Sequence, residues 1–383
     1  MCGSRILAQE AGGVNHRYPI LLSLIFLAFL VSFPAAAAEE WVLTSTEQPG
    51  FHILDVAVSG DGAYRAVTGD GGVLLQTAAG TELWRSPDGR YRSIALSGDG
   101  DILVAGGDGM LVRHRNGTVL ATVPSRNFVN EVAITADGSR IAVAFDDETL
   151  RTYDTTGTLL QTTDTWDDLM SIAVSPEGIY IAGGTDTGNV VLYSDSGEVR
   201  WSYRLSREPV ISIAMADGGR TIAAVSEDGA VALLSRAGRL LWKGTAPHSG
   251  GVALTADGAT GAIADLQGIR VIERDGTPAG RIAEAGAPVA FAMDDAGTYV
   301  MSTDGIHVSC FERGCMGGPD ATACPTGHPA GASPEVSPAI PAEEMPTGGE
   351  QPVPTQSPAP FAPMVAGLLC GAVWAAAGRL HTK

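Results

Sequence analysis

Basic residues are scarce in this sequence. Its 383 residues include 24 Lys and Arg against 43 Asp and Glu, so the formal net charge is −19, and the only lysines are Lys243 and Lys383. Between the two hydrophobic ends, 20 basic residues oppose 42 acidic ones, a net charge of about −22. Because affinity for nucleic-acid phosphates needs clustered positive charge, we predict that this protein binds neither DNA nor RNA.

Catalytic motifs are also missing. The histidines are scattered, with no H-E-x-x-H spacing, and no G-x-S-x-G sequence occurs. Acidic residues could pair across a channel as acid and base, but one sequence does not show which of them converge. We therefore assign no catalytic residue, and an enzyme remains an alternative.

Helical spacing is absent over any useful length between residues 55 and 314. This part of the chain instead repeats a unit of 38 to 41 residues seven times. Each unit has an alanine in an apolar run and a glycine five residues later, at Ala57 and Gly62, Ala95 and Gly100, Ala133 and Gly138, Ala173 and Gly178, Ala214 and Gly219, Ala253 and Gly258, and Ala292 and Gly297. A second glycine recurs at Gly80, Gly117, Gly157, Gly197, Gly238, Gly276 and Gly314. Two glycines per unit indicate two turns.

Within a unit, apolar residues alternate with period 2 between turn residues, as in pleated strands. In the copy from Ser171 to Leu205, this pattern predicts strands at 171–175, 180–183, 190–194 and 198–203. Four short strands in a unit repeated seven times predict an all-β fold, a seven-bladed β-propeller of four-stranded antiparallel blades. A solenoid of stacked sheets is the competing arrangement.

A ring must close its last blade, and the chain after Gly314 supplies no fourth strand. The missing strand is expected at the other end, because Glu39–Leu43 is similar to Thr81–Trp84 and to the segments that end at Trp201 and Trp242. We predict that residues 41–45 complete blade 7 beside strands near 290–294, 298–302 and 306–311. Such closure removes exposed sheet edges.

The segments Gly238–Lys243, Glu82–Trp84 and Val199–Trp201 resemble the Gly-x-x-x-Trp repeats of pyrroloquinoline-quinone-type propellers, and the chain is equally similar to divergent WD-repeat-like propellers. The resemblance implies a structural role, docking neighbouring blades, for Trp41, Trp84, Trp201 and Trp242. It also implies one alternative function, a quinoprotein-like oxidoreductase. No cofactor is predicted, because the adjacent cysteines and the dedicated pocket expected of such an enzyme are not visible.

The two ends predict export and membrane attachment. Residues 1–38 have Arg5 and Arg17 before an apolar run and a small-residue stretch, as in a signal peptide. The propeller is expected over 39–314, and a cysteine-containing, then proline-rich disordered stalk over 315–360. Residues 361–383 have an apolar stretch and a basic end, as in a transmembrane anchor. This organisation resembles archaeal and some bacterial surface proteins, with the propeller outside the cell; an uncleaved N-terminal anchor is the alternative.

Only three cysteines lie outside the hydrophobic ends, namely Cys310, Cys315 and Cys324. An exported protein commonly forms a disulfide, and we favour Cys315 with Cys324, which leaves Cys310 unpaired. A metal site that also uses His328 is the alternative, although its spacing matches no familiar zinc module. Asn116 begins an Asn-Gly-Thr sequon at a predicted hairpin tip and is a candidate glycosylation site.

Function is expected in the loops, which a rigid propeller presents on one face. The connections from the fourth strand of one blade to the first strand of the next are rich in aromatic residues and arginine, as interaction hot spots are. The candidate binding residues are His52, Arg90, Tyr91, Arg92, Arg126, Asn127, Phe128, Trp166, Asp167, Asp168, Arg207 and His248. Ordinary solvated loops are the alternative.

The loops between second and third strands contain about one aspartate per blade: Asp70, Asp108, Asp146, Asp186, Asp228, Asp265 and Asp304. A ring of carboxylates could hold calcium, which prefers several oxygen ligands. Asp-Gly sequences are also favoured in ordinary turns, so we predict no metal site and keep these residues as weak candidates.

We predict an exported, membrane-tethered propeller that binds a protein or a glycan at the cell surface, through loops that need little ordering on binding. An extracytoplasmic enzyme, either an oxidoreductase or a hydrolase, and an envelope-assembly scaffold are the alternatives.

Overall fold

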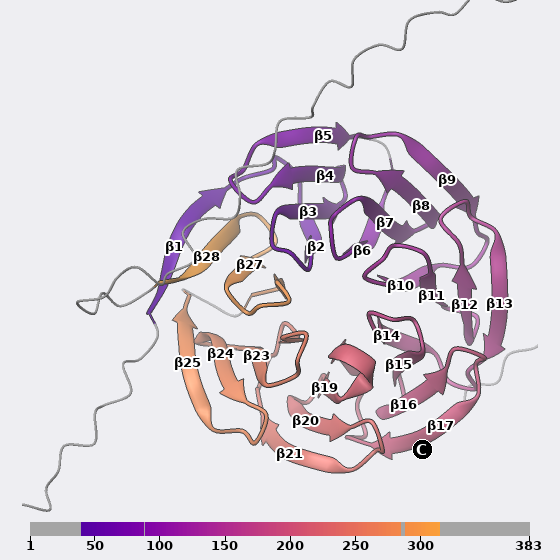
Figure 1. Ribbon diagram of the computed structural model, residues 1–383, viewed down its shortest axis with the longest axis vertical. Helices are drawn as coiled ribbons and strands as arrows, with labels where there is room; N and C mark the ends of the chain where they lie inside the picture. The colour runs from indigo at the N-terminus through magenta and orange to yellow at the C-terminus, as the bar shows by residue number, and fades with distance from the viewer. Residues whose placement is uncertain (1–39, 88, 285–287, 315–383) are drawn as a thin grey trace, which may run out of the picture. The chain divides into compact units, whose positions relative to one another are not determined.

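The structure is a computed structural model that describes residues 40–314 except 88 and 285–287. The predicted signal peptide, stalk, anchor and Cys315–Cys324 disulfide lie outside these residues. Seven four-stranded antiparallel sheets are arranged in a ring, which confirms the predicted propeller (Figure 1). The one helical element of the described residues is a 3-10 turn, η1 (Asp217–Gly219). No helix in residues 40–314, as described, is long and apolar enough to cross a membrane.

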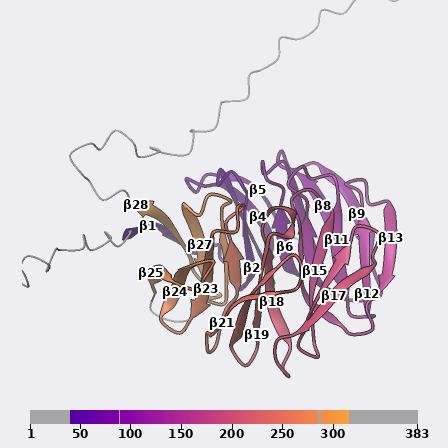
Figure 2. The same ribbon diagram turned by 60° about the horizontal axis from the view of Figure 1, so that its bottom comes forward.

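The four strands of each blade are given in order from the inner strand to the outer strand. Figure 2 shows the blades from an oblique direction. Blade 1 comprises β2 (Ile53–Val58), β3 (Tyr64–Gly69), β4 (Gly72–Thr77) and β5 (Glu82–Ser86). Blade 2 comprises β6 (Tyr91–Leu96), β7 (Ile102–Gly107), β8 (Gly109–His114) and β9 (Val119–Pro124). Blade 3 comprises β10 (Val129–Ile134), β11 (Ile141–Phe145), β12 (Thr149–Tyr153) and β13 (Leu159–Asp164). Blades 4 and 5 comprise β14 (Leu169–Val174), β15 (Tyr180–Thr185), β16 (Asn189–Ser194) and β17 (Val199–Arg204); and β18 (Val210–Met215), β19 (Thr221–Ser226), β20 (Ala230–Ser235) and β21 (Leu240–Thr245). Blades 6 and 7 comprise β22 (Val252–Leu254), β23 (Thr260–Asp265), β24 (Gly268–Glu273) and β25 (Pro278–Ala283); and β26 (Ala290–Met293), β27 (Tyr299–Thr303), β28 (Val308–Gly314) and β1 (Glu40–Glu47).

The inner strands begin earlier than the sequence pattern predicted. In blade 4 the strand was expected from Ser171, whereas β14 starts at Leu169, which pairs with Thr185 across an irregularity in register. Blades 1, 2, 3 and 5 have the same irregularity. A bulge breaks the two-residue alternation on which the prediction depended.

The first repeated glycine is explained by its backbone conformation. At Gly62, Gly100, Gly138, Gly178, Gly219, Gly258 and Gly297, φ lies between +65° and +72°. L-residues with a Cβ atom rarely adopt this region, so the turn between first and second strands selects glycine in every blade.

At Gly117, Gly238 and Gly276, the second repeated glycine packs against a tryptophan of the preceding blade. Trp84 Nε1 donates to the Arg115 carbonyl at 2.9 Å, and Trp201 Nε1 donates to the Arg236 carbonyl at 2.8 Å. A Cβ atom on Gly238 would lie 3.0 Å from the Trp201 ring, and one on Gly276 would lie 1.9 Å from Trp242 Nε1. These tryptophans therefore dock blades 1, 4 and 5 onto a turn of the next blade.

Blade 7 is closed by the N-terminal strand, as predicted, because β1 pairs with β28. Two details differ from the sequence pattern. Ser45 lies opposite Cys310, at the position where blades 1, 4 and 5 have the docking tryptophan, and Trp41 lies four residues earlier opposite Arg313. Gly314 belongs to β28 and makes no turn, since the outer strand of blade 7 arrives from the other end of the chain.

Backbone bonds join the blades on the side of the first turns. Asp61 N donates to Gly98 O at 2.9 Å, and Gly98 N donates to Ala136 O at 2.8 Å. Across the closure, Asp295 N of blade 7 donates to Gly60 O of blade 1 at 3.0 Å. Blades 7 and 1 are therefore joined by the same kind of contact as blades that are consecutive in the chain.

Candidate functional site

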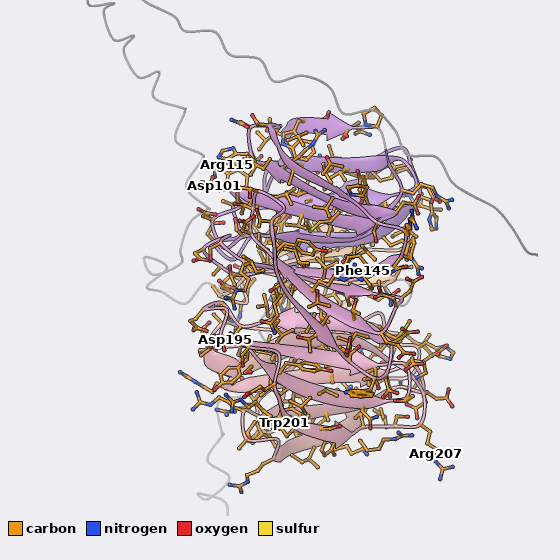
Figure 3. The ribbon with its side chains drawn as sticks, turned by 90° about the vertical axis from the view of Figure 1, so that its right-hand side faces the viewer. Asp101, Arg115, Phe145, Asp195, Trp201 and Arg207 are labelled. Atoms are coloured by element: carbon orange, nitrogen blue, oxygen red, sulfur yellow. The ribbon has the colours of Figure 1, made fainter. Side chains whose placement is uncertain are left out.

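The propeller has two distinct faces. One face of the propeller is formed by the connections between blades and by the connections between the second and third strands of each blade. We refer to this side as the loop face. Figure 3 shows Arg207 at this edge, with Asp101, Arg115 and Asp195 at the opposite edge. The predicted binding residues that lie in these connections therefore belong to one face of the propeller.

Trp166 is the most exposed large apolar residue of the described chain. It lies between β13 and β14, its relative exposure is 84%, and its φ is +66°. Glu148, in the neighbouring β11–β12 loop, also has a positive φ of 57°. A tryptophan held in a left-handed conformation persists only where surrounding contacts fix it, and such strain is common at functional sites.

Hydrogen bonds from blades 3 and 4 fix this loop. Thr165 N donates to the Glu148 carbonyl at 2.9 Å, and Glu148 N donates to Asp168 Oδ1 at 3.3 Å. Thr187 Oγ1 donates to Asp167 Oδ2 at 2.8 Å. Asp167 and Asp168 were predicted as binding residues, and the structure shows that their carboxylates position the loop which presents Trp166.

The surroundings of Trp166 are acidic. Burial raises the pKa of Asp186, and the carboxylates of Asp167 and Asp168 raise it further. No ion pair joins Glu148, Asp167, Asp168 or Asp186 to an arginine or histidine of the residues that the structure describes. An exposed aromatic ring within an unpaired acidic patch can contact a partner through both apolar and cationic groups.

Blades 1 and 2 contribute a second group on the loop face. Asp70 lies 3.6 Å from Arg90 and 4.0 Å from His52 Nδ1. The Arg92 guanidinium lies over the Phe128 ring, 5.5 Å from its centre. These surface contacts are weak individually, and they hold the side chains close to the protein.

The remaining predicted binding residues lie apart or make local contacts. Asn127 donates from its side chain to Asp147, and Tyr91 is the first residue of β6. Arg126, Arg207 and His248 are exposed, and His248 has a φ of +55°. The predicted residues therefore form separate groups.

A cavity on the propeller axis was not predicted from the sequence. It has a volume of about 390 Å³ and is lined by residues from the inner part of all seven blades, including Asp55, Arg92, Glu131, Ser212 and Phe291. A signal for it exists in the repeat, since four of its polar residues stand two positions before the repeated alanines: Asp55, Ser93, Glu131 and Ser212.

Most residues at this position connect neighbouring blades. Asp55 Oδ2 accepts a hydrogen bond from Ile94 N at 2.9 Å, and Ser93 Oγ accepts one from Val132 N at 3.1 Å. Ser212 Oγ does the same for Val252 N at 3.2 Å. Glu131 differs, because its carboxyl group has no hydrogen-bond partner among the described residues.

The two channel carboxyl groups have raised pKa values. Burial raises the pKa of Asp55 to about 7, although hydrogen bonds from Ile94 N and Val56 N lower it in part. Burial also raises the pKa of Glu131 well above its ordinary value, and the nearby charge of Asp55 adds to this effect. Because the cavity is poorly solvated, the pKa values of these two acids differ from those of exposed acids on the outer surface.

One family model matches the chain, the outer membrane protein assembly factor BamB model of PQQ propeller repeats, over residues 162–282. This segment runs from β13 through blades 4 and 5 to β25 in blade 6. This match and the seven-bladed ring together support a PQQ-like propeller-repeat protein. No curated protein matches this sequence.

In this PQQ-like propeller, the aspartates of the second loops are turn residues. Asp146 Oδ1 accepts from Phe128 N at 2.8 Å, Asp228 Oδ1 from Ala230 N at 3.1 Å, and Asp304 Oδ1 from Ile306 N at 2.9 Å. Across the described ranges, no group of three or more His, Cys, Asp or Glu side chains is arranged to hold a metal ion. The candidate calcium ligands Asp70, Asp108, Asp186 and Asp265 are therefore not brought together with them.

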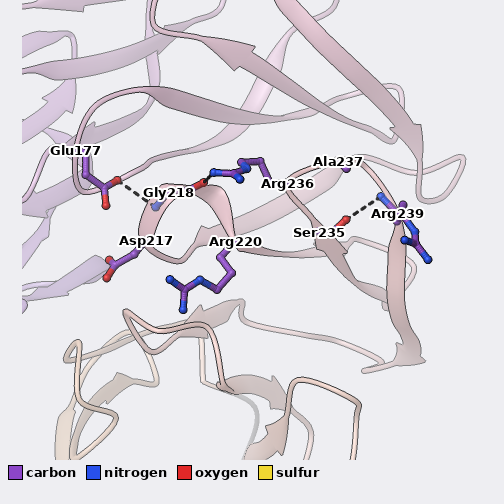
Figure 4. Close-up of a pocket in the computed structure, with 8 residues that line it drawn as sticks. All are labelled: Glu177, Asp217, Gly218, Arg220, Ser235, Arg236, Ala237 and Arg239. Carbon is purple, nitrogen blue, oxygen red and sulfur yellow. Dashed lines mark hydrogen bonds between the residues drawn. The ribbon is translucent and has the colours of Figure 1, made fainter.

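A pocket of about 470 Å³ on the turn side of blades 4 and 5 of the PQQ-like propeller contains arginines (Figure 4). Glu177 Oε2 accepts from Gly218 N at 3.1 Å, and Arg236 Nη1 donates weakly to Gly218 O at 3.5 Å. Arg239 is turned away from Arg220 and Arg236 in Figure 4. Its charged groups do not converge on one point.

Asn116, the glycosylation candidate, is exposed in the turn between β8 and β9, where its side chain accepts from Thr118 N at 2.9 Å. The predicted hairpin tip is confirmed, and glycan attachment stays a prediction.

Proposed function

We propose that this PQQ-like propeller is an exported, membrane-tethered scaffold that binds a partner protein through its loop face. The main support for this proposal is the presentation of Trp166. Its side chain is 84% exposed, and hydrogen bonds from two blades fix its loop. A rigidly presented tryptophan loses little conformational entropy on binding, which is the usual property of a hot-spot residue.

The family match supports a scaffold role. The matching model is named for an outer membrane protein assembly factor, and the matched residues 162–282 include the Trp166 loop. An assembly role in a cell envelope is consistent with the signal peptide, stalk and anchor expected in residues 1–38 and 315–383. These sequence features support the membrane-tethered part of the proposal.

The enzyme alternative has one observation in its favour. An enzyme is expected to have acidic groups of shifted pKa in a channel, and Asp55 and Glu131 have this property. However, Asp55 already accepts hydrogen bonds from Val56 N and Ile94 N, so only Glu131 offers a free carboxyl group. The pair therefore favours ligand binding over acid–base chemistry.

Site-specific photo-crosslinking on intact cells tests the scaffold proposal. A photoreactive amino acid is placed at position 166 and, as a matched control, at Leu160, which is exposed on outer strand β13 of the same region. We expect a discrete protein adduct from position 166 and none from position 160. The adduct should fractionate with membranes and become soluble when residues 361–383 are deleted.

Trp166→Ala provides the affinity measurement. The side chain is exposed, so the melting temperature should stay unchanged while binding of the crosslinked partner weakens at least about tenfold, as for a hot-spot residue. Equal adducts from both positions would contradict the proposal, and an adduct that is carbohydrate in mass would indicate a glycan-binding face instead.

A further inference from the structure

The cavity on the propeller axis has two different walls. Its charged residues, Asp55, Arg92 and Glu131, come from β2, β6 and β10 of blades 1 to 3. The residues from blades 5 to 7, on the other side of the ring, carry no charge, and they include the apolar side chains of Ile211 and Phe291. A ligand that contacts both walls can therefore have a charged end and an uncharged body.

Glu131 is the only carboxyl group of this cavity that is free to bind a ligand. Asp55 accepts from Val56 N at 2.8 Å and from Ile94 N at 2.9 Å, so both of its oxygens are engaged. Arg92 forms no ion pair with either acid within the described part of the chain, and its guanidinium lies over Phe128. Glu131 thus lines the cavity as a hydrogen-bond acceptor without a protein donor.

We propose that the axial cavity binds a small organic cation, whose ammonium group contacts Glu131 and whose apolar body packs against Ile211 and Phe291. A volume of about 390 Å³ is in the range of small-molecule sites. An ammonium group supplies the donors and the charge that Glu131 lacks, whereas a divalent metal would require more oxygen ligands than this wall offers.

The electrostatics of the cavity make binding depend on pH. The titratable and charged groups that line it are Asp55, Arg92 and Glu131, and the lining residues from blades 4 to 7 add none. Burial and the charge of Asp55 favour the protonated form of Glu131, which shows as its raised pKa. An ammonium ligand binds the ionised form, so binding should release protons and strengthen from pH 5 to pH 8.

Calorimetric titration of the full exported chain with hexylammonium tests the proposal. Two buffers of different ionisation enthalpy report proton release, and 1-hexanol and calcium serve as the neutral and metal controls. We expect binding of hexylammonium that is at least tenfold tighter at pH 8 than at pH 5, and no binding of either control.

Variants separate the site from general charge effects. Glu131→Gln should weaken hexylammonium binding at least tenfold and retain its melting temperature, because the carboxyl group has no structural hydrogen bond. Glu198→Gln removes an exposed carboxylate at the outer rim and should bind like the wild type. Absence of hexylammonium binding, equal binding by Glu131→Gln, or binding of hexanol or calcium instead would overturn the proposal. None of these outcomes depends on the partner of the loop face.

Discussion

At the scale of single residues, Asp55 differs from its equivalents Ser93 and Ser212 because it places a titratable carboxyl group at the same position of the repeat. Ser93 and Ser212 connect neighbouring blades with neutral hydroxyl groups, and Asp55 makes the equivalent contact with a carboxyl group. Burial raises the pKa of Asp55 to about 7, so the folded protein binds a proton more tightly than the unfolded chain does.

The contribution of protonated Asp55 to stability is complete below about pH 4 and is lost as the pH rises through about 7. Asp55→Asn keeps the group neutral, so the loss of stability between pH 5 and pH 8 should shrink by about 3 kcal/mol, since the two pH units from 5 to the pKa of about 7 each correspond to about 1.4 kcal/mol. Urea denaturation at both pH values measures this difference.

Asp99→Asn is the contrasting variant. Hydrogen bonds from Asp101 N and Ser97 Oγ outweigh burial and lower the pKa of Asp99. Its contribution is therefore present above the pKa of the unfolded chain, and this variant should not flatten the profile between pH 5 and pH 8. An unchanged pH profile in Asp55→Asn would show that the channel carboxyl group is not the source of the dependence.

At the scale of elements, the contact between outer strands and turns explains how blades recognise one another. Trp242 on β21 of blade 5 packs against Gly276 in the β24–β25 turn of blade 6, where φ is +86°. The glycine is required both by its conformation and by the close approach of the ring.

Gly276→Ala should lower the free energy of unfolding by about 3 kcal/mol, from backbone strain of about 1 kcal/mol and displacement of Trp242. Gly50→Ala is the matched control, because Gly50 has a similar φ of +90° and no atom lies within 4 Å of its Cβ position. Only the strain cost, about 1 kcal/mol, is expected there.

A double variant isolates the contact. In a Trp242→Ala background, the cost of Gly276→Ala should fall to the value of Gly50→Ala, as chemical denaturation can measure. Identical costs of Gly276→Ala with and without Trp242 would show that the ring makes no contribution.

At the scale of the whole molecule, closure of the ring depends on one buried arginine. Arg65 on β3 of blade 1 has 0% side-chain exposure and bonds Glu47 Oε1 on β1 at 2.5 Å. It also donates to Cys310 Sγ at 2.6 Å and to Gln76 Oε1 at 3.1 Å. Burial alone would lower the pKa of Arg65, but Cys310, Tyr299 and Glu47 together raise it, so the group stays charged.

Arg65→Met should destabilise the protein by about 3 kcal/mol, because it leaves Glu47 partly buried without its cation. Arg90→Met is the control, since Arg90 is 78% exposed beside Asp70 and should change stability by less than about 0.5 kcal/mol. Thermal unfolding and limited proteolysis of blade 7 measure the effect. Equal stability of the two variants would contradict the role of Arg65 in closure.

Local sequence determined the number of blades, their strands and the origin of the closing strand. Glycine turns and two-residue alternation depend on neighbours in the chain, so Gly62 and its six equivalents indicated the repeat without tertiary information. The bulges and the register of β1 were not predictable in this way, because hydrogen-bonded pairing such as Ser45 with Cys310 compares residues far apart in the chain.

The tertiary structure alone decided which side chains meet. Asp55 and Glu131 come from different blades, and Arg65 meets Glu47 and Cys310 only because the ring closes. The aspartates of the second loops are regular in sequence and do not converge, whereas hydrogen bonds from blades 3 and 4 fix the irregular loop that exposes Trp166. Interactions between residues close in the chain therefore determine the blades, whereas long-range packing determines which side chains form the candidate sites.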